Sequence, residues 1–443
     1  MQTKVRGFGF RGWMLIIYQA IAYITFQVFT QYPLNILADL YGGAQTVSRL
    51  YSICAIVGIL IQLALVGVIS KMKNIKLFGS ILGAITLVLA FLVMTLPAGT
   101  GWYICYALIN IFAVLYATFS LGILVGQWFP TRKGTVMGIA TLAFPIANGL
   151  LGPFASAVFA KGFPDVKGAF LPFFILSIVG WLIGIIFIKD YPEQVGAFRD
   201  NNRNMTPEVA KAIMLEEIEN KKTSVWTYLN TLKNREFWFA TIVVSLLLGC
   251  SIGVMSQSNA IITAYEAELS FIGGYTGVMI MIMIFGCIGS FVLGLLDTKF
   301  GTKRAMIISS CLMIVAGILG NIPSAGSLLA AMIFVALFMG AASNFGVSCA
   351  AQYWRREDFS RIFTLSSPIG SAISSAAPMV VAGLLFGATG YKGHGGLFIL
   401  VGVCGVVALV CMLLFSPKHI KKTDDAYRAA AGKPLDDALV GRK

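Results

Sequence analysis

The sequence predicts an all-α membrane protein with twelve transmembrane helices in two parallel six-helix repeats. Three observations predict this fold class. The 443 residues are 58% hydrophobic and only 12% charged, whereas a soluble protein carries roughly 25% charged residues. The apolar residues form continuous runs, and a helix needs about 20 such residues to cross a bilayer. Four residues of the first half of the chain also recur as the same residue type in the second half, at a nearly constant distance along the sequence.

The apolar runs are separated by short polar segments and are continuous rather than alternating, which favours helices over the strands of a barrel. The first run continues for about 25 residues after a basic segment, whereas the apolar core of a signal peptide has roughly 7–15. We therefore expect that this segment is not cleaved as a signal peptide and that it forms the first transmembrane helix. The expected spans are 13–37, 47–70, 76–97, 101–127, 135–161, 168–190, 236–265, 272–297, 303–322, 324–352, 362–389 and 393–416.

The placement of Lys and Arg predicts the orientation, because these residues accumulate in cytoplasmic loops. With the N-terminus inside, all but four of the 33 cations fall on the cytoplasmic side. The exceptions are Arg49, Lys161, Lys167 and Lys392. We therefore predict a multi-pass protein of the cytoplasmic (inner) membrane with both termini in the cytoplasm.

An internal repeat divides the chain into two halves. Four markers recur at offsets of 223 to 226 residues, in topologically matching spans. Matched spans that follow in the same order indicate parallel halves. We predict an N-terminal bundle over 1–190, a cytoplasmic linker over 191–235, a C-terminal bundle over 236–416 and a cytoplasmic tail over 417–443. The matched pairs are Trp13 and Trp238, Gln31 and Gln257, Gln127 and Gln352, and Pro145 and Pro368.

Twelve helices in two such halves are the architecture of the major facilitator superfamily, which the chain resembles over about residues 10–416. The loop GLLDTKFGTKR (294–304) is similar to the family's charged cytoplasmic motif. This resemblance implies a gate built on Asp297, Gly301 and Arg304. The first-half counterpart, GVISKMKNIK (67–76), departs from the motif, with Lys71 in place of the acid.

Two further segments, QWFPTRKGTVMGI and NREFWFATIVV, resemble the oxalate/formate antiporter and monocarboxylate transporter branch of that family. The resemblance implies an organic anion such as a monocarboxylate as substrate. The positions where the oxalate exchanger carries cations are Ser290 and Gly370 here. Neither side chain pairs with a carboxylate, so oxalate itself is not expected.

Neutral polar residues mark the candidate substrate site. In the first span, Gln19, Tyr23, Gln27 and Gln31 are each four residues apart, so they form one slowly winding stripe. Such a stripe is hard to accommodate against lipid. For each residue alone, the alternative is a hydrogen bond between helices. The predicted substrate-binding residues, from the spans that line the cavity of this fold, are Tyr23, Gln27, Gln31, Asn110, Gln257, Asn259 and Asn344.

Charged groups are missing from the middle of the spans. A charge at mid-bilayer costs about 2.5–3.5 kcal/mol, and no Asp, Glu or His lies there. The eight cysteines form no CxxC pair. We therefore expect no metal, no cofactor and no enzymatic activity. No buried carboxylate is expected to carry a proton, which leaves exchange, facilitated diffusion or coupling through Glu266 and Glu268. The basic residues form no single face for nucleic acid.

Together these features predict a secondary active or facilitative transporter that moves a small organic solute by alternating access. The expected partners are the small-molecule substrate and the lipid bilayer, and the expected state is a monomer. Two alternatives remain open from the sequence. One is transport or export of a neutral or amphipathic solute. The other is a non-transporting membrane sensor built on the same fold.

Overall fold

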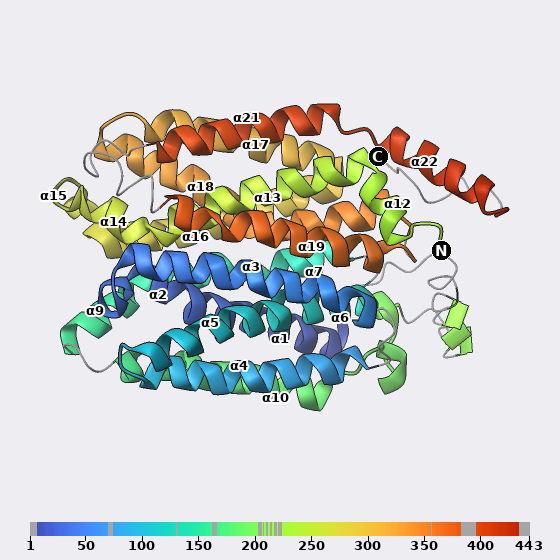
Figure 1. Ribbon diagram of the computed structural model, residues 1–443, viewed down its shortest axis with the longest axis horizontal. Coiled ribbons are helices and arrows are strands. Elements are labelled where there is room, and N and C mark those ends of the chain that lie inside the picture. Colours follow the sequence, from blue (N-terminus) through green and yellow to red (C-terminus); the bar gives the residue numbers. More distant parts are fainter. Residues whose placement is uncertain are drawn as a thin grey trace.

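The computed structural model describes residues 7–69, 74–129, 132–161, 166–202, 224–355, 357–381 and 396–433, with isolated positions between 206 and 219. Long helices lie side by side along one direction (Figure 1). Among these described residues, ten helices are long and apolar enough to cross a membrane, and an eleventh candidate consists of two segments bent by 48°. The all-helical fold class is confirmed. The eleventh expected span, 362–389, is described only to residue 381.

The helices of the N-terminal half follow the expected order (Figure 1). Three of its six spans are interrupted: the first, the fourth and the fifth. The helices are α1 (Gly9–Phe26), η1 (Gln27–Gln31) and α2 (Tyr32–Asn35), then α3 (Ala44–Ile69), α4 (Ile75–Thr95), α5 (Thr100–Val114), η3 (Leu115–Ser120) and α6 (Leu121–Trp128), then α7 (Lys133–Ala140), α8 (Ala143–Gly149), α9 (Leu151–Lys161) and α10 (Val166–Phe187).

The C-terminal half is preceded by the short helix α12 (Tyr228–Lys233) and followed by the tail helix α22 (Pro417–Ala430). Both lie at the end of the molecule that carries the linker, which we call the linker side; the opposite end is the distal side (Figure 1). The helices between them are α13 (Arg235–Ser256), α14 (Ser258–Thr263), α15 (Glu266–Leu269), α16 (Gly274–Phe300), α17 (Thr302–Gly320), α18 (Ala325–Tyr353), α19 (Phe359–Ser375) and α21 (Leu397–Leu414).

The two halves meet at two groups of helices. In the first group α3 packs against α19. In the second group the α7–α8 segment packs against α16 and α18. A glycine allows α16 to approach the α7–α8 segment closely. A Cβ atom added at Gly286 would lie 2.6 Å from the Cβ of Pro145. Gly294, two turns further along α16, has no atom within 4 Å of such a Cβ. Close packing against the other half therefore depends on a small residue at Gly286 but not at Gly294.

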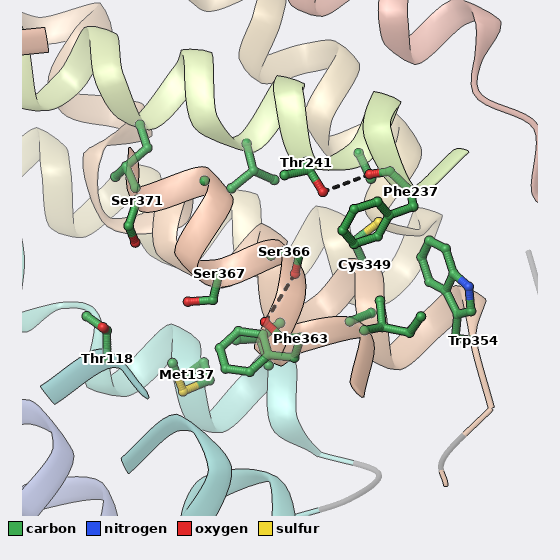
Figure 2. A pocket seen from close by; sticks show the side chains of 18 of the residues that line it. Thr118, Met137, Phe237, Thr241, Cys349, Trp354, Phe363, Ser366, Ser367 and Ser371 are labelled. Carbon is green, nitrogen blue, oxygen red and sulfur yellow. Dashed lines mark hydrogen bonds between the residues drawn. The ribbon is translucent and has the colours of Figure 1, made fainter. Parts of the chain in front are cut away.

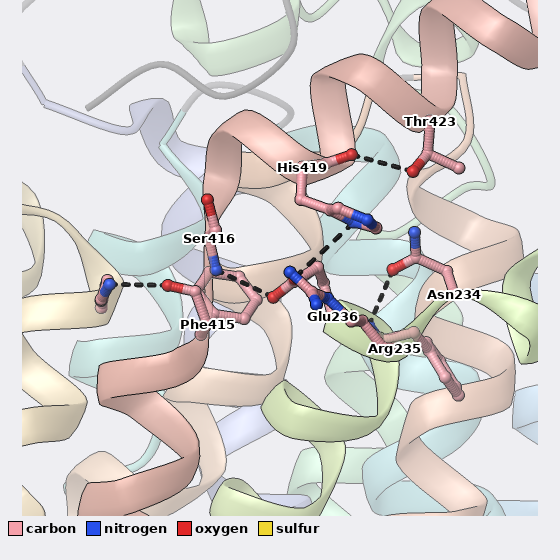
Figure 3. A network of polar contacts seen from close by, with 9 residues as sticks. Asn234, Arg235, Glu236, Phe415, Ser416, His419 and Thr423 are labelled. Atoms are coloured by element: carbon pink, nitrogen blue, oxygen red, sulfur yellow. Dashed lines mark hydrogen bonds and ion pairs between the residues drawn. The ribbon is translucent and has the colours of Figure 1, made fainter.

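The tail helix α22 is fixed to the linker-side end of the C-terminal half. The carboxylate of Glu236, which is fully buried, accepts a hydrogen bond from the backbone N–H of Ser416 at 2.8 Å and one from Nε of Arg235 at 2.9 Å (Figure 3). Ser416 immediately precedes α22. One buried acid thus joins the start of α13 to the start of the tail helix.

A second buried acid holds the middle of α22. Asp424 accepts from Nη2 of Arg355 at 2.8 Å and from Nε1 of Trp226 at 2.9 Å. Arg355 follows α18, and Trp226 precedes α12. The tail helix therefore ties together three segments that are far apart in the sequence.

Candidate functional site

Four helices lose their regular geometry at positions related by the repeat. In the N-terminal half, η1 and η3 are π-helical turns. In the C-terminal half, Gln257 separates α13 from α14, and α18 bends by 48° between residues 341 and 344. Gln257 is the repeat partner of Gln31 at the end of η1, and the bend in α18 corresponds to η3. Single π-helical turns occur frequently at functional sites.

A cavity with two adjacent lobes lies between the halves. The linker-side lobe has a volume of about 100 Å³ and the distal lobe about 90 Å³. Thr118, Leu248 and Ser371 line both lobes. Thr118 belongs to the π-helical turn η3, whereas Leu248 and Ser371 come from α13 and α19. Residues from both halves therefore line each lobe.

The linker-side lobe is lined mainly by apolar side chains of the C-terminal half. Figure 2 shows Phe237 of α13 and Phe363 of α19 around this space, with Met137 reaching it from α7. Tyr23 also lines it and packs its ring against Phe144 at a centroid distance of 4.7 Å. Some hydroxyl groups in this wall already form hydrogen bonds within the protein. Thr241, for example, donates to the carbonyl oxygen of Phe237 at 2.7 Å (Figure 2).

The distal lobe carries the amide side chains. Gln27 and Gln31, at the two ends of η1, both line it. Gln31 donates from Nε2 to the hydroxyl of Tyr51 at 2.9 Å. Gln27 is only 7% exposed as a residue, and within the described part of the chain its amide has no hydrogen-bond partner. The amide atoms themselves are not fully buried, so they are accessible from the lobe and available to a bound molecule.

The described lining of both lobes contains no Asp, Glu, Lys, Arg or His. Likewise, the described residues hold no cluster of three or more His, Cys, Asp or Glu side chains that suits a metal ion. An uncharged, partly apolar space can bind a neutral solute through a few hydrogen bonds and apolar contact.

The distal side of the cavity is closed by hydrogen bonds between the halves, which we call the distal latch: Asn35 and Ser48 from the N-terminal half, and Gln257, Ser258 and Asn259 from the C-terminal half. Asn35 donates from Nδ2 to Oγ of Ser258 at 2.7 Å and accepts from the backbone N–H of Asn259 at 3.1 Å. Gln257 donates to Oγ of Ser48 at 3.3 Å.

Beyond the latch lies a separate polar hollow of about 680 Å³, which Asn35, Gln257 and Asn259 line. The distal latch therefore stands between this hollow and the cavity. Asn35 is not among the substrate-binding residues predicted from the sequence. The signal was nevertheless present, because Asn35 is the next member of the stripe after Gln31 at the same four-residue step.

The structure divides the predicted substrate-binding residues among three places. Tyr23, Gln27 and Gln31 line the cavity, while Gln257 and Asn259 belong to the distal latch. The remaining two lie in helix contacts. Asn110 donates to the carbonyl oxygen of Tyr106 at 2.7 Å, one turn earlier in α5. Asn344 lies against α7, where its amide nitrogen, in the orientation that satisfies its neighbours, donates to the carbonyl oxygen of Met137 at 3.0 Å.

The predicted gating residues lie at the linker-side junction of α16 and α17. Asp297 accepts from Oγ1 of Thr302 at 2.6 Å. Gly301 has a φ of +89°, a conformation that favours glycine, and Arg304 is exposed. Oε1 of Gln352, a marker of the repeat, accepts from the first backbone N–H of α17 at 2.7 Å. This cluster connects α16, α17 and α18 within one half and does not line the cavity.

One buried acid lies at the start of α19 and has a raised pKa. Asp358 precedes α19 and accepts a hydrogen bond from Oγ of Ser224. Burial raises the pKa of Asp358 to about 7, and the hydrogen bond from Ser224 opposes that rise. The native state therefore binds this proton more tightly than the unfolded chain does. The contribution of Asp358 to stability is complete at acidic pH and is lost as the pH rises through about 7.

This arrangement of helices is the major facilitator fold. The structure is similar to that of the proton:xylose symporter XylE bound to 6-bromo-6-deoxy-D-glucose, with a TM-score of 0.67 and 14% identity over 91% of this chain and 96% of that chain. It is also similar to the crystal structure of the nucleoside transporter NupG, with a TM-score of 0.58 and 12% identity over 91% of this chain and 98% of that one. No protein-family model and no curated protein sequence matches the chain.

Proposed function

We propose that the chain is a secondary transporter of the major facilitator superfamily that moves a small neutral organic solute by alternating access. One observation carries the proposal: a cavity whose described lining is uncharged lies between the two halves, with the unpartnered amide of Gln27 on a π-helical turn in its wall. The halves, 1–190 and 236–416, rock about this space, and the linker 191–235 joins them. The distal latch is the contact that opens when the site turns to the distal side.

The nature of the cavity wall supports a neutral solute over the organic anion implied by the sequence resemblance. A bound carboxylate needs a cation or several donors to replace its water. No Lys or Arg occurs among the described residues that line either lobe. The two structural neighbours are described as transporters of xylose and of nucleosides, and xylose is also uncharged.

The distribution of cations supports a linker side that faces the cytoplasm. All but four of the 33 Lys and Arg residues belong to the linker, the tails or the loops on that side of the predicted topology. We expect a reporter enzyme that is active only in the cytoplasm to be active when fused after residue 430. Activity of a periplasm-specific reporter at the same position would contradict the proposed orientation.

Replacing Gln27 should weaken solute binding without unfolding the protein. We expect Gln27→Ala to reduce affinity roughly 2- to 13-fold, because one hydrogen bond of about 0.5–1.5 kcal/mol is lost. Uptake into liposomes should first be measured for xylose, uridine and lactate with the unaltered protein, and affinity for the transported solute then compared between variants.

Asn110→Ala is the matched control, since Asn110 is also a buried amide but lies outside the cavity lining. It should lower the melting temperature and leave affinity unchanged. Uptake of lactate without uptake of any neutral solute would contradict the proposed substrate class. Equal affinity in the Gln27→Ala variant and the unaltered protein would remove Gln27 from the site.

A further inference from the structure

The cavity also indicates which neutral solutes fit, an inference that rests on the proposed transport function. We propose that the solute is a largely apolar molecule with few hydrogen-bonding groups, whose polar end lies at Gln27 and whose apolar body lies in the linker-side lobe. Such a molecule differs from a polyol, which carries a hydrogen-bonding group on nearly every carbon atom.

The linker-side lobe offers mainly apolar contact surface. Phe237, Val244, Val347 and Phe363 contribute apolar side chains to its wall. Several of its hydroxyl groups already donate to backbone carbonyl oxygens: Thr118 to Val114, Thr241 to Phe237 and Ser366 to Phe363. The hydroxyls of Tyr23 and Ser367 have no described partner. The lobe can therefore pair a few hydroxyl groups of a solute, but not one on every carbon atom.

The polar end of the solute is assigned to an amide side chain of the distal lobe. The amide of Gln27 has both a donor and an acceptor and lacks a protein partner among the described residues. The hydroxyl of Ser371, which lines both lobes, likewise has no described partner. Gln27 belongs to the N-terminal half and Ser371 to α19. One polar group of the solute can therefore be held from both halves at once.

Thr118, Leu248 and Ser371 stand in the walls of both lobes, so the lobes are adjacent and the proposed molecule spans the two. With a polar group at Gln27, the rest of that molecule extends past Leu248 into the space between Phe237 and Phe363. This placement satisfies the free amide and buries the apolar body against an apolar wall. A sugar in the same place would pair a few of its hydroxyls and leave the others without partners.

Three neutral probes test this arrangement by equilibrium dialysis against the full-length protein in lipid nanodiscs, with empty nanodiscs as the partition blank. The probes are 4-phenylbutyramide, which joins an amide to an apolar body, acetamide, which is the amide alone, and xylose, which is a polyol. We expect 4-phenylbutyramide to bind at least tenfold more tightly than either of the others.

Two substitutions locate the two ends of the bound probe. Gln27→Met, which keeps the length of the side chain, should weaken 4-phenylbutyramide roughly 2- to 13-fold through the lost hydrogen bond. Val244→Ala, which removes two methyl groups from the linker-side lobe, should weaken it roughly four- to fifteenfold and leave acetamide unchanged. Val244→Thr repeats the second test with a side chain of nearly the same shape as valine. The melting temperature of each variant shows whether it is folded.

Binding of 4-phenylbutyramide no tighter than that of xylose, including no binding, overturns the inference, as does unchanged binding in both variants. Failure of the transport proposal gives a different result, because liposomes would then take up no solute of any polarity. Uptake of xylose with strong binding, together with weak binding of 4-phenylbutyramide, would leave the transporter in place and remove the apolar substrate class.

Discussion

A covalent link across the distal latch should reduce transport to the level of empty liposomes. The link joins Asn35→Cys to Ser258→Cys through a short bifunctional methanethiosulfonate reagent. These two side chains come from opposite halves and lie 2.7 Å apart at their nearest polar atoms. If the halves separate at the distal side in every transport cycle, a bond at this point holds the cavity closed to that side. Reduction of the link should restore transport.

The native cysteines require matched controls, because the chain already contains eight. Each single variant treated with the reagent should retain transport, since one new thiol cannot bridge the latch. Mass spectrometry should identify the peptide that joins residues 35 and 258. A preparation in which this link is complete and transport is undiminished would show that the latch does not open, and alternating access through this contact would be wrong.

The second large effect is expected at the tail helix, where Asp424→Ala should destabilise the protein by about 3–5 kcal/mol. The side chains of Arg355 and Asp424 are 3% and 0% exposed and lie 2.8 Å apart. The substitution removes the carboxylate from a buried guanidinium and also from Nε1 of Trp226. Removal of one partner from a buried ion pair is far more costly than the pair itself is stabilising. We therefore expect a lower melting temperature and faster proteolysis within α22.

The neighbouring residue supplies the control for this prediction. Asp425 lies on the same helix but is partly exposed, and Asp425→Ala should change stability by no more than about 0.5 kcal/mol. Asp424→Asn keeps the size of the side chain and an oxygen acceptor for Trp226, so its effect should be intermediate. Equal stability of the Asp424→Ala and Asp425→Ala variants would show that the tail helix is not held by this acid.

The first span shows how far periodicity alone can predict a site. Tyr23, Gln27 and Gln31 are spaced by four residues, and all three line the cavity of the structure. A helix presents such residues on one slowly turning face whatever packs against it, so their shared direction is a local property. Whether they bind substrate stays a prediction, which the Gln27 variants test.

The fold class follows from the sequence alone, because the thickness of a bilayer dictates the length of each apolar run and Lys and Arg mark its ends. Which polar residues meet depends on tertiary packing. Gln31 and Gln257 are repeat partners in the sequence. Gln257 nevertheless lies in the distal latch and bonds Ser48, whereas Gln31 lines the cavity. Contacts between segments more than 200 residues apart depend on the π-helical turns and on packing between the halves, neither of which a local pattern records.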